Sequence, residues 1–499
     1  MLLILLFTFT GCENDGLKNK SHRVGKALAE KHCQSCHLLP HPEELNRSTW
    51  KNDVLPKMGG RLGVMTTDYA EIELLQKLDL FPQSAVLDRN EWNQLMDYYI
   101  DNAPLFELPV EKFLPTSTSL NSFDVEIPDL EGMAPYTTLL HWDDRNNVLL
   151  IGSDVDRKLR VFVPGKNDYQ TISMPGAPSS LISDESGLWV LTMGKVMPHS
   201  ENYGQLGFLP FETDGTLGLP DMVLKGLSRP VHAVADDLDQ DGAPDMLISC
   251  FGNYRGRLSW YNNFSSEQGQ EKILRLQPGA IKAEIADMNQ DDLPDVVALF
   301  GQGDEGLFLF QNMGNGSFNE SVLIRFPATY GSTYFEILDY NGDQLPDILY
   351  VNGDNGDYYP LKKGYHGLRL FLNQGNNEFR EHFFLPLYGA IKAKAHDFDQ
   401  DGDWDIAAIS YFPDYKNRSE EGFVYFENNG KDEFSRATFK NSTLGKWLTM
   451  DIGDIDLDGD TDIVLGSAAY MQVEVPANIK QKWKEKANPV LFLKNKLKR

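Results

Sequence analysis

Beyond residue 130 most of the chain consists of short apolar runs that end at turns rich in Gly, Asn and Asp. Short apolar runs bounded by such turns are typical of β-strands. Such strands end in turns of aromatic, Asn and Gly residues at 307–318, 368–379 and 423–434. Four strands in each unit of about 50 residues predict the blades of a β-propeller.

The first hundred residues have helical periodicity instead. Apolar residues recur at helical spacing in His22–His32, and Glu91–Ile100 is a second amphipathic segment that contains aromatic residues. The sequence therefore predicts a small all-α domain before a mainly β domain.

Composition fits two globular domains. The chain has 499 residues, of which 41% are hydrophobic and 24% charged. There are 46 Lys and Arg against 73 Asp and Glu, which gives a net charge of -27. Such a surface repels phosphate backbones, so no nucleic-acid partner is expected. Four cysteines are too few for a disulfide framework.

The chain begins with an apolar run, residues 1–11, that is too short to span a bilayer and is typical of a signal peptide. Gly11 before Cys12 resembles a bacterial lipoprotein processing site, which would make Cys12 the lipidated first residue of the mature protein. Residues 13–20 are then expected to form a flexible tether. The alternative is a cleaved secretory peptide without lipid. The lipoprotein interpretation implies the bacterial cell envelope, with a lipid anchor in the outer membrane, on its periplasmic face or at the cell surface.

A C-x-x-C-H motif follows the first helical segment, at Cys33, Cys36 and His37. This spacing is typical of covalent attachment of one haem c, with His37 as the proximal iron ligand. The alternatives are a zinc site, which lacks a second Cys pair in this chain, and a redox dithiol, which lacks the expected βαβ pattern. Residues 21–105 resemble class I cytochromes c, in which a small residue such as Gly25 lets two helices cross closely.

The sixth iron ligand has three candidates. A methionine ligand suits an electron carrier because it raises the reduction potential. Met58 is the first choice and Met65 the second. His41 is only four residues beyond the proximal ligand and would hardly reach the other face of the haem.

Five acidic loops recur at intervals of 50, 52, 58 and 57 residues, each followed by an apolar strand. Asp or Asn occupies positions 1, 3, 5 and 9, and alternate oxygen ligands of this kind suit Ca²⁺. Asp292 and Gln344 replace the Gly of position 6 in loops two and three, so weaker sites are expected there. The ligand residues, loop by loop, are Asp237, Asp239, Asp241, Asp245; Asp287, Asn289, Asp291, Asp295; Asp339, Asn341, Asp343, Asp347; Asp397, Asp399, Asp401, Asp405; and Asp454, Asp456, Asp458, Asp462.

These units resemble FG-GAP/VCBS repeats, the Ca²⁺-binding blades of integrin-like propellers. Two degenerate units without the ligand spacing precede them, at 143–152 and 183–191, which brings the expected number of blades to seven. A strand near 122–127 is expected to join the last blade and close the ring. Cys250 is expected to be a buried thiol.

The expected organisation has four parts. Residues 1–20 form the signal peptide and tether, and 21–108 the haem domain. Residues 109–130 are a linker with the ring-closing strand, and 131–499 form the propeller.

Five positions before each acidic loop lies a residue that could face the central axis of the propeller. Together these side chains would form a cationic funnel able to bind a carboxylate or a sugar acid. The alternative is that they line a water-filled channel or pair with neighbouring acidic residues. The residues are His232, Lys282, Tyr334, Lys392 and Thr449.

The sequence predicts an exported, lipid-anchored electron-transfer protein with one covalent haem c and up to five Ca²⁺ ions, whose propeller docks a redox partner protein. Two alternatives remain open. One is a haem-linked carbohydrate-active enzyme, since some such propellers resemble lyases; the other is a glycan-binding or adhesion module. Fold alone does not decide among them.

Overall fold

The computed structural model describes residues 12–106, 108, 113–130, 132–166, 169–213, 215–265, 269–485 and 488–498. The chain divides into two compact units. The first comprises Met1–Val110 with Pro327–Thr329 and Gly356–Lys363, and the second comprises Glu111–Phe326, Tyr330–Asn355 and Gly364–Arg499. The predicted signal peptide, residues 1–11, lies outside the described residues.

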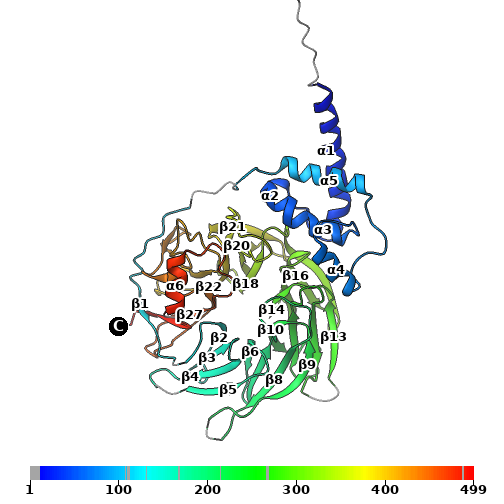
Figure 1. The fold of residues 1–499 in the computed structure, drawn as a ribbon. Helices are drawn as coiled ribbons and strands as arrows, with labels where there is room; N and C mark the ends of the chain where they lie inside the picture. The colour runs from blue at the N-terminus through cyan, green and yellow to red at the C-terminus, as the bar shows by residue number, and fades with distance from the viewer. Residues whose placement is uncertain are drawn as a thin grey trace, which may run out of the picture. The chain divides into compact units, whose positions relative to one another are not determined.

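The first unit is small and helical over its described residues (Figure 1). Its longest helices, α1 and α5, pack against each other. Its elements are α1 (Cys12–His32), η1 (Cys33–Ser35), η2 (Pro42–Glu44), α2 (Arg47–Thr49), η3 (Trp50–Val54), α3 (Leu55–Arg61), α4 (Tyr69–Lys77) and α5 (Arg89–Asn102).

The N-terminal helix differs from the sequence expectation. Residues 13–20, expected to be a flexible tether, belong to α1. The physical reason is that an existing helix extends at one backbone hydrogen bond per added residue, without a new nucleation cost. Among the described residues, no helix has the length and apolar character needed to cross a membrane.

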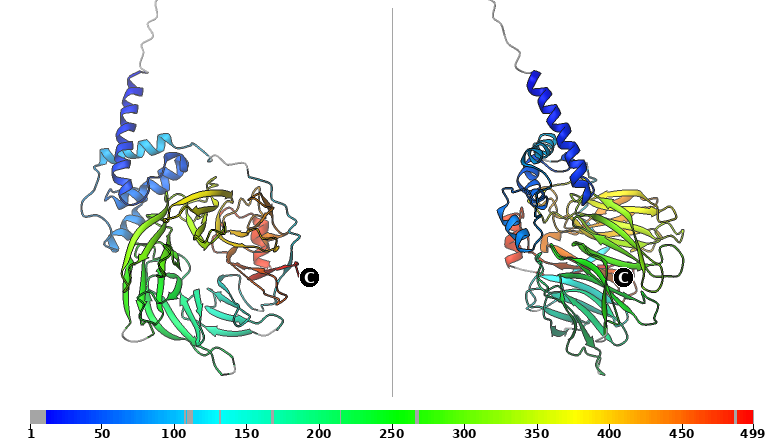
Figure 2. Two further views of the ribbon diagram at one scale, coloured as in Figure 1. Left: turned by 180° about the vertical axis from the view of Figure 1, so that it is seen from behind. Right: turned by 90° about the vertical axis from the view of Figure 1, so that its right-hand side faces the viewer.

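The second unit is a seven-bladed β-propeller, which confirms the predicted fold (Figures 1 and 2). Every blade is a four-stranded antiparallel sheet. Blade 1 contains β2 (Thr137–Asp143), β3 (Val148–Ser153), β4 (Lys158–Phe162) and β5 (Tyr169–Ser173), and blade 2 contains β6 (Pro178–Ser183), β7 (Gly187–Thr192), β8 (Gly204–Pro210) and β9 (Asp221–Leu227). Blade 3 contains β10 (Pro230–Asp236), β11 (Asp245–Cys250), β12 (Arg257–Asn262) and β13 (Gln270–Arg275), and blade 4 contains β14 (Ala280–Ala286), β15 (Asp295–Phe300), β16 (Glu305–Asn312) and β17 (Phe318–Phe326). Blade 5 contains β18 (Ser332–Leu338), β19 (Asp347–Asn352), β20 (Gly367–Asn373) and β21 (Phe379–Pro386), and blade 6 contains β22 (Ala390–His396), β23 (Asp405–Ser410), β24 (Phe423–Asn428) and β25 (Phe434–Ala437).

Blade 7 is built from both ends of this unit. It contains β26 (Trp447–Gly453), β27 (Asp462–Ser467) and β28 (Val490–Asn495), and its outermost strand is β1 (Phe123–Glu126). Strand β1 pairs with β28 in antiparallel register, with Phe123 opposite Asn495. The expected closing strand, 122–127, therefore lies at the seam of the ring. The short helices η4 (Ser442–Leu444) and α6 (Ala477–Glu485) lie between strands of the last blades.

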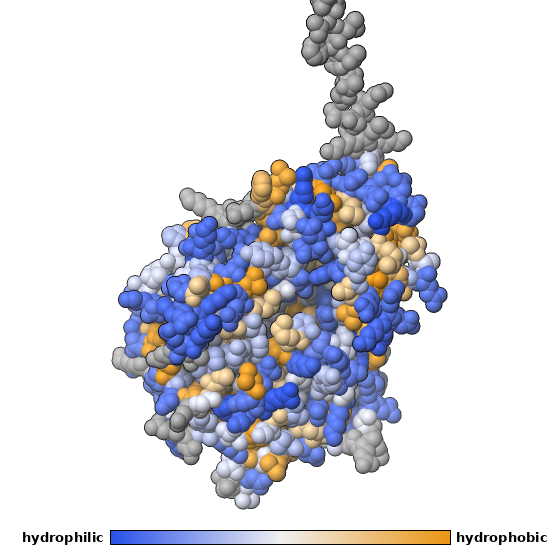
Figure 3. All heavy atoms as spheres, viewed as in Figure 1, coloured by the Kyte–Doolittle hydropathy of each residue, from blue (hydrophilic) through white to orange (hydrophobic). Residues whose placement is uncertain are grey.

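The core of the propeller lies between neighbouring blades. The second strand of each of blades 3 to 7 is buried at every position. Both faces of these strands are covered by adjacent blades, so their sequences are continuously apolar rather than alternating. Cys250, at the end of β11, is 1% exposed, in line with the expected buried thiol. Hydrophilic residues dominate the face of the molecule shown in Figure 3.

Candidate functional site

Each acidic loop connects the first and second strands of a blade, in blades 3 to 7. The aspartate at position 1 organises the loop by accepting backbone N–H groups from positions 5 and 6. In loop one, Asp237 accepts from Asp241 at 3.0 Å and from Gly242 at 2.9 Å. Loop five repeats this pattern, and loop three keeps the bond from position 6. The loops are therefore tight turns whose side-chain oxygens converge.

Two positions of each loop have left-handed backbone geometry. Position 6 is Asp292 in loop two and Gln344 in loop three, with φ values of 64° and 68°. These residues adopt the strained backbone that the sequence indicated. Position 4 is also left-handed in all five loops, which the sequence analysis missed; the residues are Gln240, Gln290, Gly342, Gln400 and Leu457.

Carboxylate oxygens converge most closely in loops one, four and five. In loop one, oxygens of Asp237, Asp239 and Asp245 lie within 4.8 Å of one another. Loop five forms the same cluster, at positions 1, 3 and 9, whereas in loop four the oxygens of positions 1, 3 and 5 converge, from Asp397, Asp399 and Asp401. Oδ1 of Asp239 is buried and accepts no hydrogen bond from the described residues. A cation is the kind of ligand that such an oxygen lacks.

Loops two and three carry Asn at position 3, and its side chain pairs inside the loop. Asn289 donates to Asp291, and Asn341 donates to Asp343, each at 2.9 Å. These loops therefore carry one carboxylate fewer, and their remaining aspartates are partly neutralised by an amide.

The aspartate at position 9 begins the second strand and is buried in every loop. Burial, followed by repulsion from neighbouring carboxylates, raises the pKa of Asp245 to about 6 and that of Asp462 to about 7. Asp405 has its pKa raised to about 6, again first by burial. A bound cation would offset the cost of keeping these groups ionised.

An asparagine at the end of the third strand connects each of blades 4 and 7 to the blade before it. The backbone N–H of Asn312 donates to Asp295 of its own blade at 2.7 Å. Its side-chain amide donates to the carbonyl of Leu238, in acidic loop one of blade 3, at 3.0 Å. Asn495 makes the same two bonds, to Asp462 and to Phe398. From the sequence, Asn312 is assigned only to a turn and Asn495 is given no role.

The C-x-x-C-H motif lies at the end of α1. Helix α1 ends at His32, and one 3₁₀ turn, η1, carries Cys33. Cys33 is half-buried and Cys36 is exposed, and both are free thiols. Burial, then the neighbouring Cys36, raises the pKa of Cys33 to about 11. The thiol pair is therefore on the surface of the helical unit, with one member packed against its core.

His37 is oriented for ligation through its Nε2 atom. Its Nδ1 atom lies 2.9 Å from the carbonyl oxygen of Leu38, which can only accept a hydrogen bond. This contact places the ring proton on Nδ1 and leaves Nε2 as the donor atom for a metal.

Met58 and Cys33 pack against the same apolar cluster of the helical unit. Met58 lies in α3, the helix that directly follows the π-helical turn η3. A Cβ on the next residue, Gly59, would lie 2.9 Å from the Trp92 ring, so the glycine lets α3 approach this core. Met65 is 52% exposed, and His41 is also exposed.

Gly25 marks a close approach of α1 and α5. A Cβ at this position would lie 2.1 Å from the carbonyl oxygen of Gln94 and 2.8 Å from Cβ of Tyr98. Only glycine fits here, which is the role that the resemblance to cytochromes assigned to it. Cys12 is the first residue of α1, and its side chain lies outside the described part of the structure.

The predicted axial residues form a charge-balanced ring rather than a cationic funnel. Lys282 pairs with Glu284, donates to the carbonyl of Phe335 at 2.7 Å, and lies 4.1 Å from the centre of the Tyr334 ring. Lys392 also lies over the Tyr334 ring, at 5.4 Å. Burial, then nearby lysines, lowers the pKa of His232 to about 3. His232 is therefore neutral and adds no positive charge.

The balancing carboxylates lie two residues further along the inner strands. Lys394 donates to Glu336 at 2.9 Å, and Glu336 also accepts the backbone N–H of Ala395 in the next blade. Asp451 accepts the N–H of Trp142, which links blades 7 and 1. Glu336, Lys394 and Asp451 were not predicted from the sequence, although their constant offset from the funnel positions is visible there. The arrangement fits the alternative that the ring pairs with neighbouring acidic residues, and Thr449 lies in the same ring on β26.

The propeller repeats match a known family. The FG-GAP-like repeat family matches residues 287–350, 339–408 and 397–465. The chain carries FG-GAP-like repeats. The matched FG-GAP-like segments begin at the first residue of acidic loop two and include loops two to five.

Other comparisons are weaker. No curated protein matches the sequence. One similar solved structure is a luciferin-regenerating enzyme, with a TM-score of 0.37 and 13% sequence identity over 75% of this chain and 95% of that chain. A protein from Lactobacillus plantarum has a TM-score of 0.41 and 13% identity over 62% of this chain and 88% of its own. Regucalcin, a calcium-binding protein from Agrobacterium tumefaciens, has a TM-score of 0.36 and 11% identity over 77% of this chain and 100% of its own.

Proposed function

We propose that this protein transfers single electrons through one haem c carried by the helical unit. The observation that carries the proposal is the C-x-x-C-H motif, in which His37 has its Nδ1 atom turned to a backbone carbonyl and its Nε2 atom left for iron. A class I cytochrome would also need the close helix crossing that Gly25 permits. Two thiols and an oriented imidazole suit haem better than zinc, because no further Cys pair is present in the sequence.

The residues would hold the haem in distinct ways. Cys33 and Cys36 would form the two thioether links, and His37 would be the proximal ligand. Met58 would be the distal ligand, since it shares the apolar cluster with Cys33, whereas Met65 is more exposed. When bound, the haem would supply one-electron chemistry, while this chain would fix its ligands.

The five acidic loops are proposed to bind Ca²⁺, with the tighter sites in loops one, four and five. The buried Asp239 oxygen without a hydrogen-bond donor supports a cation in loop one. We further propose that Cys12 is lipidated and holds the protein at the bacterial outer membrane. The propeller then presents a rigid face to a redox partner protein.

Potentiometric titration of the full chain tests this function. The account expects one one-electron wave, a changed potential in Met58→His, and an unchanged one in Met65→Leu. If only Met65→Leu changes the reduction potential, Met65 rather than Met58 is the distal ligand. A protein that holds haem but exchanges no electrons with small mediators would contradict the function.

A sugar oxidoreductase or a glycan-binding module remains the second candidate. The observation that favours a ligand-binding role is a pocket on the propeller that carries only positive charges. Reduction of the haem by a sugar alone, with no other protein present, would support the enzyme.

A further inference from the structure

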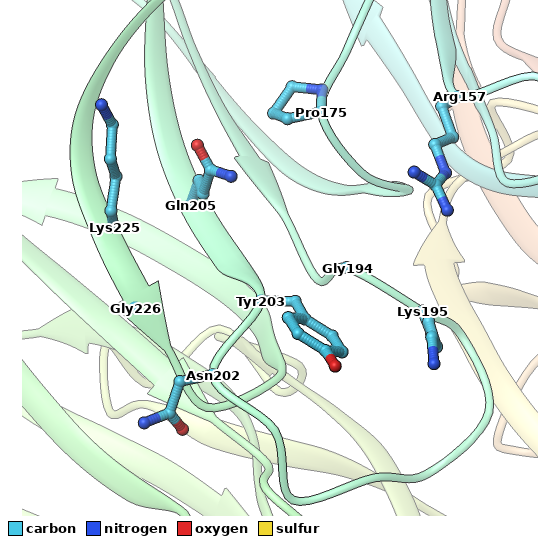
Figure 4. A pocket seen from close by; sticks show the side chains of 9 residues that line it. All are labelled: Arg157, Pro175, Gly194, Lys195, Asn202, Tyr203, Gln205, Lys225 and Gly226. Carbon is cyan, nitrogen blue, oxygen red and sulfur yellow. The ribbon is translucent and has the colours of Figure 1, made fainter.

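A pocket of about 470 Å³ lies between blades 1 and 2, and it belongs to none of the sites described above (Figure 4). Its volume is in the range of pockets that hold small molecules. Four segments of chain contribute to it: the turn before β4, the connection before β6, the loop from β7 to β8 with the start of β8, and strand β9. The lining residues are Arg157, Pro175, Gly194, Lys195, Asn202, Tyr203, Gln205, Lys225 and Gly226.

The charge of this pocket is opposite to that of the protein. Arg157, Lys195 and Lys225 line it, and no carboxylate does. None of the three cations forms an ion pair or side-chain hydrogen bond with the described residues. Lys195 lies 5.4 Å from the centre of the Tyr203 ring, and none of the three cations pairs with a carboxylate in the described part of the chain. In a chain with net charge -27, three such cations around one cavity indicate attraction of an anion.

The carboxylates nearest in sequence are engaged elsewhere. Asp156, beside Arg157, pairs with Arg160. Glu201 lies 3.1 Å from Nδ1 of His199. The cations of the pocket are therefore not neutralised by their own neighbours.

Two lining residues, Pro175 and Gly194, lie beside a close backbone contact. A Cβ on Gly176 would lie 2.9 Å from Cα of Gly194, so two glycines let blade 1 meet the loop of blade 2. Backbone hydrogen bonds connect Met193 and Gly194 with Ala177 on both sides of this contact. This contact fixes the backbone on which Pro175 and Gly194 lie before a ligand arrives.

Polar and aromatic groups complete the lining. Asn202 accepts a hydrogen bond from Ser228 at 2.6 Å, which leaves its amide N–H groups for a ligand. Gln205 and Lys225 are cross-strand partners on β8 and β9. Tyr203 lies in the middle of the group, with Arg157 and Lys195 on one side and Gln205 and Lys225 on the other (Figure 4). The ring of Tyr203 can cover the body of a ligand while the cations bind its charge.

We infer that this pocket binds a small saccharide that carries an anionic group, a carboxylate, sulfate or phosphate. The inference is independent of the haem, because all the lining residues belong to the propeller. It also places anion binding here rather than at the charge-balanced central axis.

Calorimetric titration of the full chain, with Ca²⁺ present, tests the inference. The probes are digalacturonate, glucose 6-sulfate and glucose 6-phosphate, with galactobiose and glucose as neutral counterparts. The three anionic probes distinguish the possible charged groups. At least one anionic probe is expected to bind about tenfold more tightly than its neutral counterpart, and to weaken as salt is raised.

Two variants with equal change of net charge make the test specific. Arg157→Ala/Lys195→Ala/Lys225→Ala is expected to weaken binding about tenfold or more, while Arg145→Ala/Lys416→Ala/Lys440→Ala, at exposed sites outside the pocket, is expected to leave it unchanged. If the triple variant is unstable, the single variant Lys195→Glu is used instead and is expected to weaken binding of the anionic probes. Equal binding of charged and neutral sugars, equal loss in both triple variants, or no binding of any probe would overturn the inference.

Discussion

The side-chain amide of Asn495 in blade 7 donates a hydrogen bond to the carbonyl of Phe398 in blade 6, at 2.7 Å. The backbone N–H of the same residue donates to Asp462, also at 2.7 Å. One asparagine thus joins acidic loop five to acidic loop four. Because Asn495 and Asp462 are both 3% exposed or less, water cannot easily replace these bonds.

Replacing Asn495 should weaken the contact between blades 6 and 7 and so destabilise the propeller. We expect Asn495→Ala to lower the free energy of unfolding by about 1–3 kcal/mol, because a buried carbonyl loses its donor. Asn319→Ala, at an exposed position of β17, is the control and should change it by less than about 0.5 kcal/mol. Urea denaturation measures both. Equal effects of the two substitutions would show that the link between blades does not stabilise the ring.

Calcium removal should destabilise the propeller, because clustered carboxylates would then repel one another. A chelator is expected to lower the melting temperature, and Ca²⁺ to restore it. Asn289→Asp should tighten the site of loop two, since it supplies the carboxylate that loops one, four and five already have at position 3. Calorimetry with Ca²⁺ reports both affinity and stoichiometry. A melting curve insensitive to chelator would contradict calcium binding by the loops.

Backbone strain at position 6 predicts a reciprocal pair of effects. Gln344 has a φ of 68°, so Gln344→Gly should stabilise loop three by about 0.5–1 kcal/mol. Gly402 has a φ of 99°, and a Cβ added there would meet nothing within 4 Å, so Gly402→Gln should destabilise loop four through the backbone alone. Thermal denaturation of both variants in saturating Ca²⁺ tests this. The same sign for both would reject the strain argument.

The axial ring predicts a pH-dependent effect at Lys392. Burial lowers the pKa of Lys392 to about 8. A lysine whose pKa is lower in the folded state costs stability while it is charged, and that cost disappears as pH rises from 8 to the unfolded value near 10.4. Lys392→Met should therefore stabilise the protein at pH 7 and have little effect near pH 10.5. The charged groups around it are Asp451, Lys394, Lys282 and Glu336.

Chemical denaturation at both pH values measures this difference, with Lys440→Met, at an exposed position, as the control. A gain in stability that is the same at pH 7 and pH 10.5 would mean that the titration of Lys392 is not its cause.

Local patterns in the sequence predicted the blades well, because each blade repeats one arrangement of strands and turns. The spacing of Asp residues indicated the loops, and the alternating residues at 122–127 indicated the seam. The partners of Asn312 and Asn495 could not be predicted, since each lies in another blade. Pairing of the axial lysines with acidic residues was only one of two alternatives from the sequence. Glu284 lies on the same strand as Lys282, but Glu336 becomes a neighbour of Lys394 only when the blades close into a ring.

The most direct test of the account is covalent attachment of haem. The full chain should be produced together with the cytochrome c maturation machinery, beside Cys33→Ser/Cys36→Ser and, as a control, Cys250→Ser. The account predicts a Soret band and a mass increase of one haem in the wild type and in Cys250→Ser, and neither in the double variant. A folded, colourless wild-type protein without added mass would contradict it.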